Sequence, residues 1–250
     1  MRAPAGWRAI EFASDLHLGP ATPGTLAAFE RWLASTDAEA IVLLGDVFAA
    51  WVGDDVSVDG PEARARQAVR RAVDRGCSVH VMVGNRDFLL GRRFLEAAGA
   101  APLADPTVFE AFGTRLVTTH GDLLCTRDTG YLRFRRVVRQ PVLQRLFAAL
   151  PRRLRESVGR ATRASSQGDA HRGAVDRRYE ADDGAALAWL EALGAPRLLH
   201  GHTHRPAVHA LGGGRERVVL SDWDFDQGAH RGDVLRWTAD GLARMPIPSA

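Results

Sequence analysis

Five short blocks of this 250-residue chain combine aspartate, asparagine and histidine at spacings that suit metal ions. They are Asp15-Leu16-His17, Gly45-Asp46, Gly84-Asn85-Arg86-Asp87, His120-Gly121-Asp122 and His200-Gly201-His202-Thr203-His204. Carboxylate, imidazole and amide oxygen suit ions such as Mn²⁺, Fe²⁺ or Zn²⁺, and the absence of cysteine from these five blocks argues against structural zinc. The candidate ligands are Asp15, His17, Asp46, Asn85, His120, His202 and His204. They are too many for one ion and suit a pair, the arrangement that clamps an in-line displacement at phosphorus.

Each block follows a short apolar run that is typical of a buried strand. The runs are Ala9–Ser14, Ala40–Leu44, Ser78–Val83, Arg115–Thr119 and Arg197–Leu199. Helical patterns over Thr25–Ala34 and Pro61–Arg75 lie between them. Strands that alternate with helices indicate an α/β fold with helices on both faces of the sheet. Because polar groups that follow such strands collect at one edge, we expect the five blocks to form a single site.

A basic segment interrupts this pattern. From Leu123 to Arg178 the chain has 14 arginines and four acidic residues, whereas its overall formal net charge is only +3. Apolar residues recur there at helical spacing, namely Leu143, Leu146, Phe147, Leu150, Leu154 and Val158. We expect a single domain over 1–250 with two or three helices inserted as a cap within 123–185. The alternative is a solvated helical face that covers the core.

Composition excludes several classes of protein. Hydrophobic residues make up 46% of the chain and charged residues 25%, as in an ordinary globular protein. No lysine is present, which excludes Schiff-base chemistry and a Walker A loop. We find no apolar stretch long enough to span a bilayer and no signal-like start, so we expect a cytoplasmic protein. The two cysteines cannot build a disulfide framework.

As an ordered set, the five blocks resemble those of the calcineurin-like metallophosphoesterases. This resemblance implies a four-layer αββα sandwich. It implies one metal ion held by Asp15, His17, Asp46 and His204. It implies a second ion held by Asp46, Asn85, His120 and His202. Asp46 would bridge the two ions, and a water between them would attack phosphorus. The catalytic set implied is Arg86, Asp87 and His120, with Asp87 orienting a histidine ligand.

Arg86 bears on the type of substrate. Much of the superfamily has histidine at this position, where it can protonate a departing alkoxide, whereas arginine stays charged and donates protons poorly. A leaving group that is itself a phosphate needs no proton. Arg86 therefore favours cleavage of a pyrophosphate over cleavage of an alkyl diester, and the alternative is a purely structural ion pair.

Longer matches around the blocks resemble a narrower family, the pyrophosphohydrolases that cleave UDP-2,3-diacylglucosamine in lipid A biosynthesis. The matches include Gly45–Asp55, Gly84–Gly91, His120–Thr126, Tyr131–Arg135 and His200–Ala207. The resemblance implies hydrolysis at the α-phosphate to UMP and 2,3-diacylglucosamine 1-phosphate, usually with Mn²⁺. It also implies peripheral attachment to the cytoplasmic face of the inner membrane, with the cap receiving the acyl chains.

The same resemblance implies a set of substrate contacts. These are Asn85, Arg86, Asp128, Tyr131, Arg163, Ser166, Arg172 and His200. The chain departs from the family pattern after Ser166, where Arg172 would replace a lysine.

Two other functions remain open. A related phosphoesterase could act on another nucleotide pyrophosphate or a phosphodiester, but the basic segment has few aromatics for stacking bases, so we expect no nucleic-acid partner. A non-catalytic scaffold is disfavoured because all seven ligand positions hold competent side chains. We expect a monomer.

Overall fold

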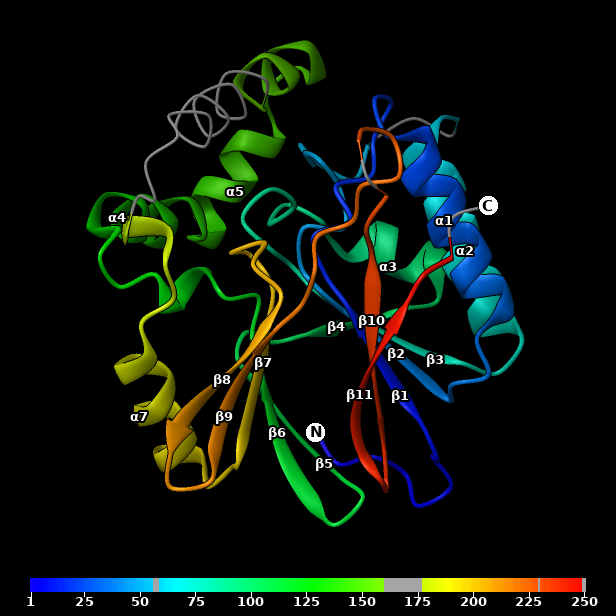
Figure 1. Cartoon of the computed structure of the whole chain (residues 1–250). Coiled ribbons are helices and arrows are strands. Elements are labelled where there is room, and N and C mark those ends of the chain that lie inside the picture. The colour runs from blue at the N-terminus through cyan, green and yellow to red at the C-terminus, as the bar shows by residue number, and fades with distance from the viewer. Residues whose placement is uncertain (56–58, 160–176, 229, 249–250) are drawn as a thin grey trace.

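The computed structural model describes residues 1–55, 59–159, 177–228 and 230–248, which contain two β-sheets packed face to face (Figure 1). The first sheet has the order β11-β10-β1-β2-β3-β4. Its strands are β1 (Ile10–Ala13), β2 (Ala40–Leu44), β3 (Ser78–Met82), β4 (Ala101–Leu103), β10 (Asp233–Thr238) and β11 (Gly241–Pro246). Strands β1 to β4 are parallel, and β10 pairs antiparallel with β1.

The second sheet has the order β5-β6-β7-β9-β8. Its strands are β5 (Thr107–Ala111), β6 (Thr114–Thr118), β7 (Arg197–His200), β8 (Ala207–Gly212) and β9 (Arg215–Val219). Strands β6, β7 and β9 are parallel, and β5 and β8 pair antiparallel at the edges. The five strands expected from the apolar runs are thus confirmed, the one over Ala40–Leu44 with the same bounds.

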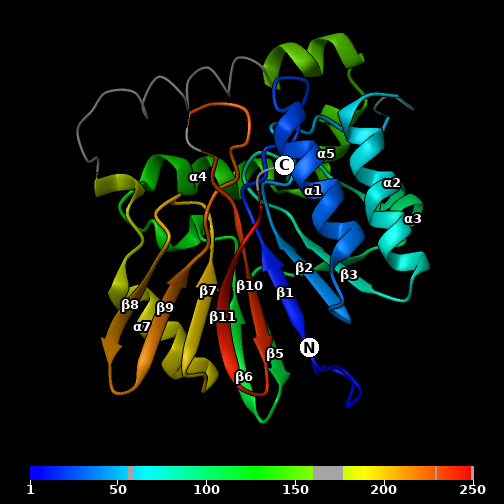
Figure 2. The same cartoon turned by 45° about the vertical axis from the view of Figure 1, so that its right-hand side comes forward.

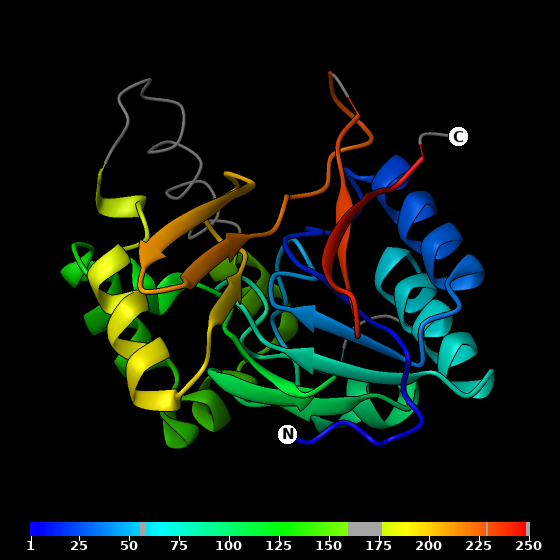
Figure 3. The same cartoon turned by 60° about the horizontal axis from the view of Figure 1, so that its bottom comes forward.

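Helices cover the outer faces of both sheets (Figure 3). Three pack on the first sheet, namely α1 (Pro23–Ser35), α2 (Pro61–Asp74) and α3 (Arg92–Ala98). One, α7 (Asp183–Leu193), packs on the second sheet. The two helices expected from the sequence are confirmed as α1 and α2. Both begin at a proline, whose missing N–H suits the first helical turn.

Successive strand residues alternate between separate apolar cores, because side chains on a strand point to opposite faces. Phe12 of β1 packs between the sheets, whereas Ala13 packs against the helices of the first sheet. Leu199 of β7 faces the same central core, and Leu198 packs against α7. Three apolar layers therefore separate four structural layers, which confirms the αββα sandwich.

Further helices lie over the carboxyl ends of the strands (Figures 1 and 2). They are α4 (Thr129–Val138), α5 (Pro141–Ala148) and the helical residues 152–159. Two short 3₁₀ turns, η1 (Asp122–Leu124) and η2 (Arg177–Tyr179), flank this segment. Neither α4 nor α5 has a buried residue, so their apolar side chains do not extend the core. No helix among the described residues has the length and apolarity to span a bilayer.

Candidate metal centre

The seven predicted ligands converge at the carboxyl ends of five strands, two of which belong to the second sheet. Asp15 and His17 follow β1, Asp46 follows β2, and Asn85 follows β3. His120 follows β6, and His202 and His204 follow β7. Because the sheets pack face to face, these strand ends lie across from each other at one end of the sandwich.

The backbone at five of these positions is left-handed. Their φ angles are 54° at Asp15, 48° at His17, 52° at Asp46, 67° at His202 and 52° at His204. Among the described residues other than glycine, only Phe112 shares this conformation. Positive φ is costly for residues with a Cβ and persists where the surrounding structure enforces it. Its concentration here indicates that the strand ends are shaped to aim side chains at a common point.

One group of donor atoms surrounds Asp15. The Nε2 atom of His204 lies 3.3 Å from its Oδ1, and the Nε2 atom of His17 lies 4.0 Å from the same oxygen. His17 Nε2 also lies 3.5 Å from Oδ2 of Asp46. That nitrogen is buried and has no hydrogen-bond partner among the described residues. A buried, unpartnered imidazole nitrogen beside two carboxylates fits a metal ligand, because a cation would satisfy all three groups.

A second group of donor atoms surrounds the side-chain oxygen of Asn85. His120 Nε2 lies 2.9 Å from this oxygen, and His202 Nδ1 lies 3.0 Å from it. His120 Nε2 is also 3.8 Å from Oδ1 of Asp46. The other ring nitrogen of His120 lies 2.9 Å from the Leu44 carbonyl, to which its N–H can donate. That bond leaves Nε2 free to ligate.

The two groups share a carboxylate. Donor atoms within 4.8 Å of one another occur in the sets Asp15–His17–His204 and Asp15–Asp46–His120. Asp15 occurs in both sets, and the Asp46 carboxylate lies 3.5 Å from His17 Nε2 and 3.8 Å from His120 Nε2, so it is also placed to join the two groups of donor atoms. Glycine is required before it, because Gly45 has φ +90° and a Cβ there would lie 2.6 Å from the His120 ring.

Burial and neighbouring charges set the protonation of the site. Burial acts to lower the pKa of His120, but the nearby carboxylates of Asp46 and Asp15 outweigh it and raise the pKa to about 9. Burial lowers the pKa of His17, and burial together with the His120 charge lowers that of His202 to about 4. Although burial opposes it, the hydrogen bond from His204 helps to hold the pKa of Asp15 below its usual range. The ionised carboxylates and the neutral imidazoles of His17 and His202 suit divalent cations, whereas the His120 imidazolium would give up its proton on binding one.

Asp87 differs from the expectation that it orients a histidine ligand. Its buried carboxylate accepts backbone N–H bonds from Gly84 at 2.7 Å and Val47 at 2.8 Å, and a longer one from Asp46 at 3.3 Å. Burial and the nearby Asp46 carboxylate raise its pKa to about 6. The side chain therefore ties the loop after β2 to the loop after β3, because buried backbone N–H groups of both loops converge on its carboxylate.

Two acidic residues that the sequence reasoning did not single out also contact the site. Asp122 is buried and accepts hydrogen bonds from Tyr131 and Arg135 of α4. Oδ2 of Asp222 lies 3.6 Å from Nδ1 of His204, and the two oxygens of this carboxylate each accept one hydrogen bond from Arg231. Asp122 stands inside one of the five blocks, which was the available signal. Asp222 had no such signal, because the fold alone brings it to His204.

The predicted substrate contacts other than Asn85 and Arg86 divide into three cases. Asp128 caps α4 by accepting the backbone N–H of Tyr131 at 2.9 Å, and the Tyr131 ring stacks near His202 at a centroid distance of 6.5 Å. Contrary to expectation, His200 is fully buried, and its two ring nitrogens face the Gly201 carbonyl and Arg217. We therefore assign His200 a structural role. The remaining predicted contacts lie outside the described residues, namely Arg163, Ser166 and Arg172.

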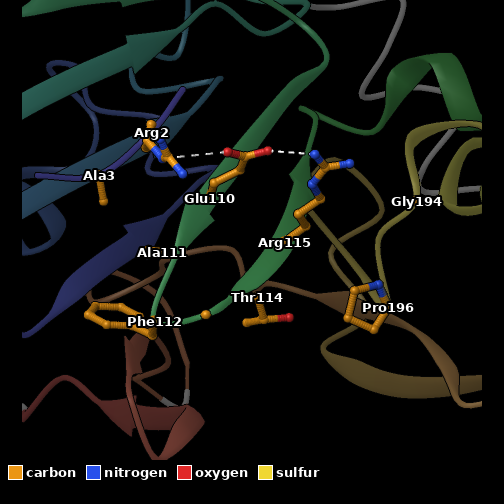
Figure 4. Close-up of a pocket in the computed structure, with 10 residues that line it drawn as sticks. Arg2, Ala3, Glu110, Ala111, Phe112, Thr114, Arg115, Gly194 and Pro196 are labelled. Carbon is orange, nitrogen blue, oxygen red and sulfur yellow. Dashed lines mark ion pairs between the residues drawn. The ribbon is translucent and has the colours of Figure 1, made fainter. Parts of the chain in front are cut away.

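A separate hollow of about 610 Å³ lies at the turn between β5 and β6, the opposite end of these strands from His120 (Figure 4). Glu110 there pairs with Arg2 at 3.9 Å and with Arg115 at 2.7 Å. The hollow contains none of the predicted metal ligands and has no part in the metal centre.

Comparison with known proteins agrees with this geometry. The profile of the calcineurin-like phosphoesterase family matches residues 10–206. A UDP-2,3-diacylglucosamine hydrolase from Ralstonia nicotianae is 45% identical, over 95% of this chain and 92% of its own length. Proteins of the same name from Xanthomonas axonopodis and Pseudomonas paraeruginosa are 42% and 39% identical, over 93% and 96% of this chain and 96% and 99% of their own lengths.

Proposed function

The chain belongs to the calcineurin-like phosphoesterase family, and from this membership we propose that it hydrolyses the pyrophosphate of UDP-2,3-diacylglucosamine. Water would add to the α-phosphorus and the bond to the β-phosphate oxygen would break. The products are UMP and 2,3-diacylglucosamine 1-phosphate. The observation that carries the proposal is the convergence of two donor groups, joined by the Asp46 carboxylate, with the Arg86 guanidinium beside them.

The donor set of the site fits a pair of divalent ions, for which we propose Mn²⁺. The first ion would be held by Asp15, His17, Asp46 and His204. The second would be held by Asp46, Asn85, His120 and His202. When bound, such ions polarise phosphoryl oxygens and lower the pKa of water toward neutrality.

The chain's own side chains would orient the substrate and stabilise its charge. Nε of Arg86 lies 3.3 Å from the Asp46 carboxylate, and its side chain is 25% exposed, so the guanidinium borders both the site and solvent. Its backbone N–H donates to Asp46 at 2.8 Å and fixes that carboxylate. We propose that Arg86 stabilises charge on the two phosphates, and that Asp128 and Tyr131 contact the nucleotide or sugar from α4.

Release of UMP tests this proposal most directly. We expect chelation to lower turnover of UDP-2,3-diacylglucosamine by roughly 1,000-fold or more, because both charge stabilisation and activation of water are lost, and we expect Mn²⁺ to restore it. In water enriched with oxygen-18, the label should enter UMP. Label in the sugar phosphate would contradict attack at the α-phosphorus, and turnover that survives chelation would contradict the metal requirement.

We propose that the helices over the site face the lipid and the membrane. Among the described residues, eight exposed large apolar side chains gather there: Phe134, Val137, Val142, Leu143, Leu146, Leu150, Leu154 and Val158. Exposed apolar side chains interspersed with arginines are typical of elements that bind anionic lipid surfaces. Under this proposal the chain acts as a monomer in the cytoplasm, held peripherally at the inner membrane.

Binding to vesicles tests the membrane proposal. Replacing Val142 and Leu146, which are 64% and 61% exposed, by asparagine should weaken sedimentation with anionic phospholipid vesicles by roughly tenfold or more, because less apolar surface is buried. The matched control is Val208→Asn, since Val208 is 61% exposed on the edge strand β8. Equal binding by all three proteins would contradict the proposal.

A further inference from the structure

Arg155 is an exception among the arginines of the helical residues 152–159. Only 2% of the surface of Arg155 is exposed, whereas Arg153, two positions before it, faces solvent. A guanidinium keeps its charge at any ordinary pH, so burying it is unfavourable unless its N–H groups find acceptors. The side chain must therefore be held by specific partners.

Those partners come mostly from the loop after β2. Nε donates to the Leu150 carbonyl at 3.0 Å, Nη1 donates to the Val52 carbonyl, and Nη2 donates to the Asp55 carboxylate. Gly53 leaves room for this contact, since it has φ +138° and a Cβ there would collide with Nη1. The loop is thus shaped to receive the guanidinium from the helix above.

The receiving loop is itself fixed to the body of the protein. The Asp54 carboxylate accepts the backbone N–H groups of Gly91 and Arg93 at 2.9 Å each, at the start of α3. The backbone N–H of Trp51 donates to the Arg86 carbonyl at 3.0 Å. A helix tied to this loop is therefore tied to the sandwich and to the strand-end loop that carries Arg86.

The segment is also anchored at its other end. Arg135 of α4 donates to Asp122 at 2.7 Å, and Arg139, the residue directly after α4, donates to the Gly84 carbonyl at 2.7 Å. Between these contacts and Arg155 lies α5, which has no buried residue and an exposed apolar side. The position of α5 over the site thus depends on the anchors on either side of it.

We propose that Arg155 is a positioning residue for the lipid-linked substrate, which it serves by holding the far end of this helical segment against loop 51–55. The inference rests on the proposed function, because only a substrate with acyl chains would use the apolar side of α5. Among the described residues, no hydrogen bond or ion pair joins Arg155 to a predicted metal ligand. Its loss should therefore impair binding of the lipid and leave the metal centre intact.

Two substrates separate these effects. Arg155→Met should lower kcat/KM for UDP-2,3-diacylglucosamine by roughly 10- to 100-fold, mainly through KM, because the binding surface is misplaced. Turnover of bis(4-nitrophenyl) phosphate, which has no acyl chains, and the metal content per chain should stay within about twofold. Arg153→Met removes the same charge from an exposed position and is the matched control. Gly53→Ala disturbs the contact from the loop side and should reproduce the defect.

Other results of these assays would contradict either the role of Arg155 or the proposed function. An unchanged KM for the lipid in Arg155→Met would overturn the inference, and so would equal losses on both substrates or an equal loss in Arg153→Met. If Arg155→Met does not fold, Asp55→Asn removes the ion pair from the side that is 48% exposed and carries the same expectation. Wild-type protein that cleaves the small diester but releases no UMP would refute the proposed function itself, and the inference with it.

Discussion

Replacing Asp46 by alanine is expected to remove both metal ions and to lower hydrolysis of the pyrophosphate by roughly 10,000-fold or more, since charge stabilisation and activation of water are lost together. The carboxylate lies 3.5 Å from His17 Nε2 and 3.8 Å from His120 Nε2, so one side chain serves both donor groups. Metal content measured by mass spectrometry and release of UMP would check the two parts of this expectation separately.

Two further variants test whether the loss in Asp46→Ala arises from the missing charge and whether Asp46 is the bridging ligand. Alanine at φ 52° adds backbone strain, whereas asparagine tolerates this conformation, so Asp46→Asn tests the charge with less disturbance. Asp15 belongs to both donor sets within 4.8 Å, so Asp15→Asn tests the rival bridging ligand. If the Asp46 variants keep two ions while Asp15→Asn keeps none, the bridge is Asp15 and our assignment is wrong.

The strands that end in the site could be predicted because most of their residues are buried. Such strands form largely apolar runs, and Ala40–Leu44 is buried at every position. The polar block that follows each run then marks a strand end. This explains why the α/β class and the grouping of the candidate ligands followed from order along the chain. The second sheet did not follow from that order, which predicted helices on both faces of one sheet, and it was implied only by the family resemblance.

The remaining strands contain charged residues. Their ion-pair partners lie on neighbouring strands and can be identified only in the folded structure. β9 begins Arg215-Glu216, and Glu216 pairs across to Arg197 of β7 at 2.7 Å. β10 includes Asp233, which pairs with Arg244 of β11 at 2.6 Å. Viewed along the sequence, such residues indicate loops. Cross-strand pairing neutralises them and lets the strands join the sheets.

The roles of individual polar residues were the least predictable part. The carboxylate of Asp87 stands beside a candidate ligand, but its geometry turns it toward backbone amides. His200 stands in a block of three histidines, yet it points into the second sheet toward Arg217. His200 is the last residue of β7, whereas His202 lies in the turn that follows and has a φ of 67°. Residues two apart share one face only within a strand, so spacing alone could not separate the residues that face the site from those that support it.

Replacing Arg86 by methionine is expected to lower kcat for the pyrophosphate substrate by roughly 100- to 1,000-fold without loss of metal, because a positioned charge near the reacting phosphates is removed. Its guanidinium lies 3.3 Å from Asp46 but is part of neither donor group. Metal content should therefore match the wild type, which separates this variant from Asp46→Ala. Arg86→Lys keeps the charge and should recover part of the activity.

Substrates with different leaving groups test whether Arg86 stabilises the departing group or only forms a structural ion pair with Asp46. If Arg86 stabilises a departing phosphate, the loss in Arg86→Met should be several-fold smaller on bis(4-nitrophenyl) phosphate, whose leaving group is not a phosphate. Arg86→His should in addition raise relative activity toward diesters with alkoxide leaving groups, because imidazolium can donate the proton that an alkoxide needs. Equal losses on all substrates would mean that Arg86 only holds Asp46 in place. In that case the preference for a pyrophosphate must arise from the helices over the site.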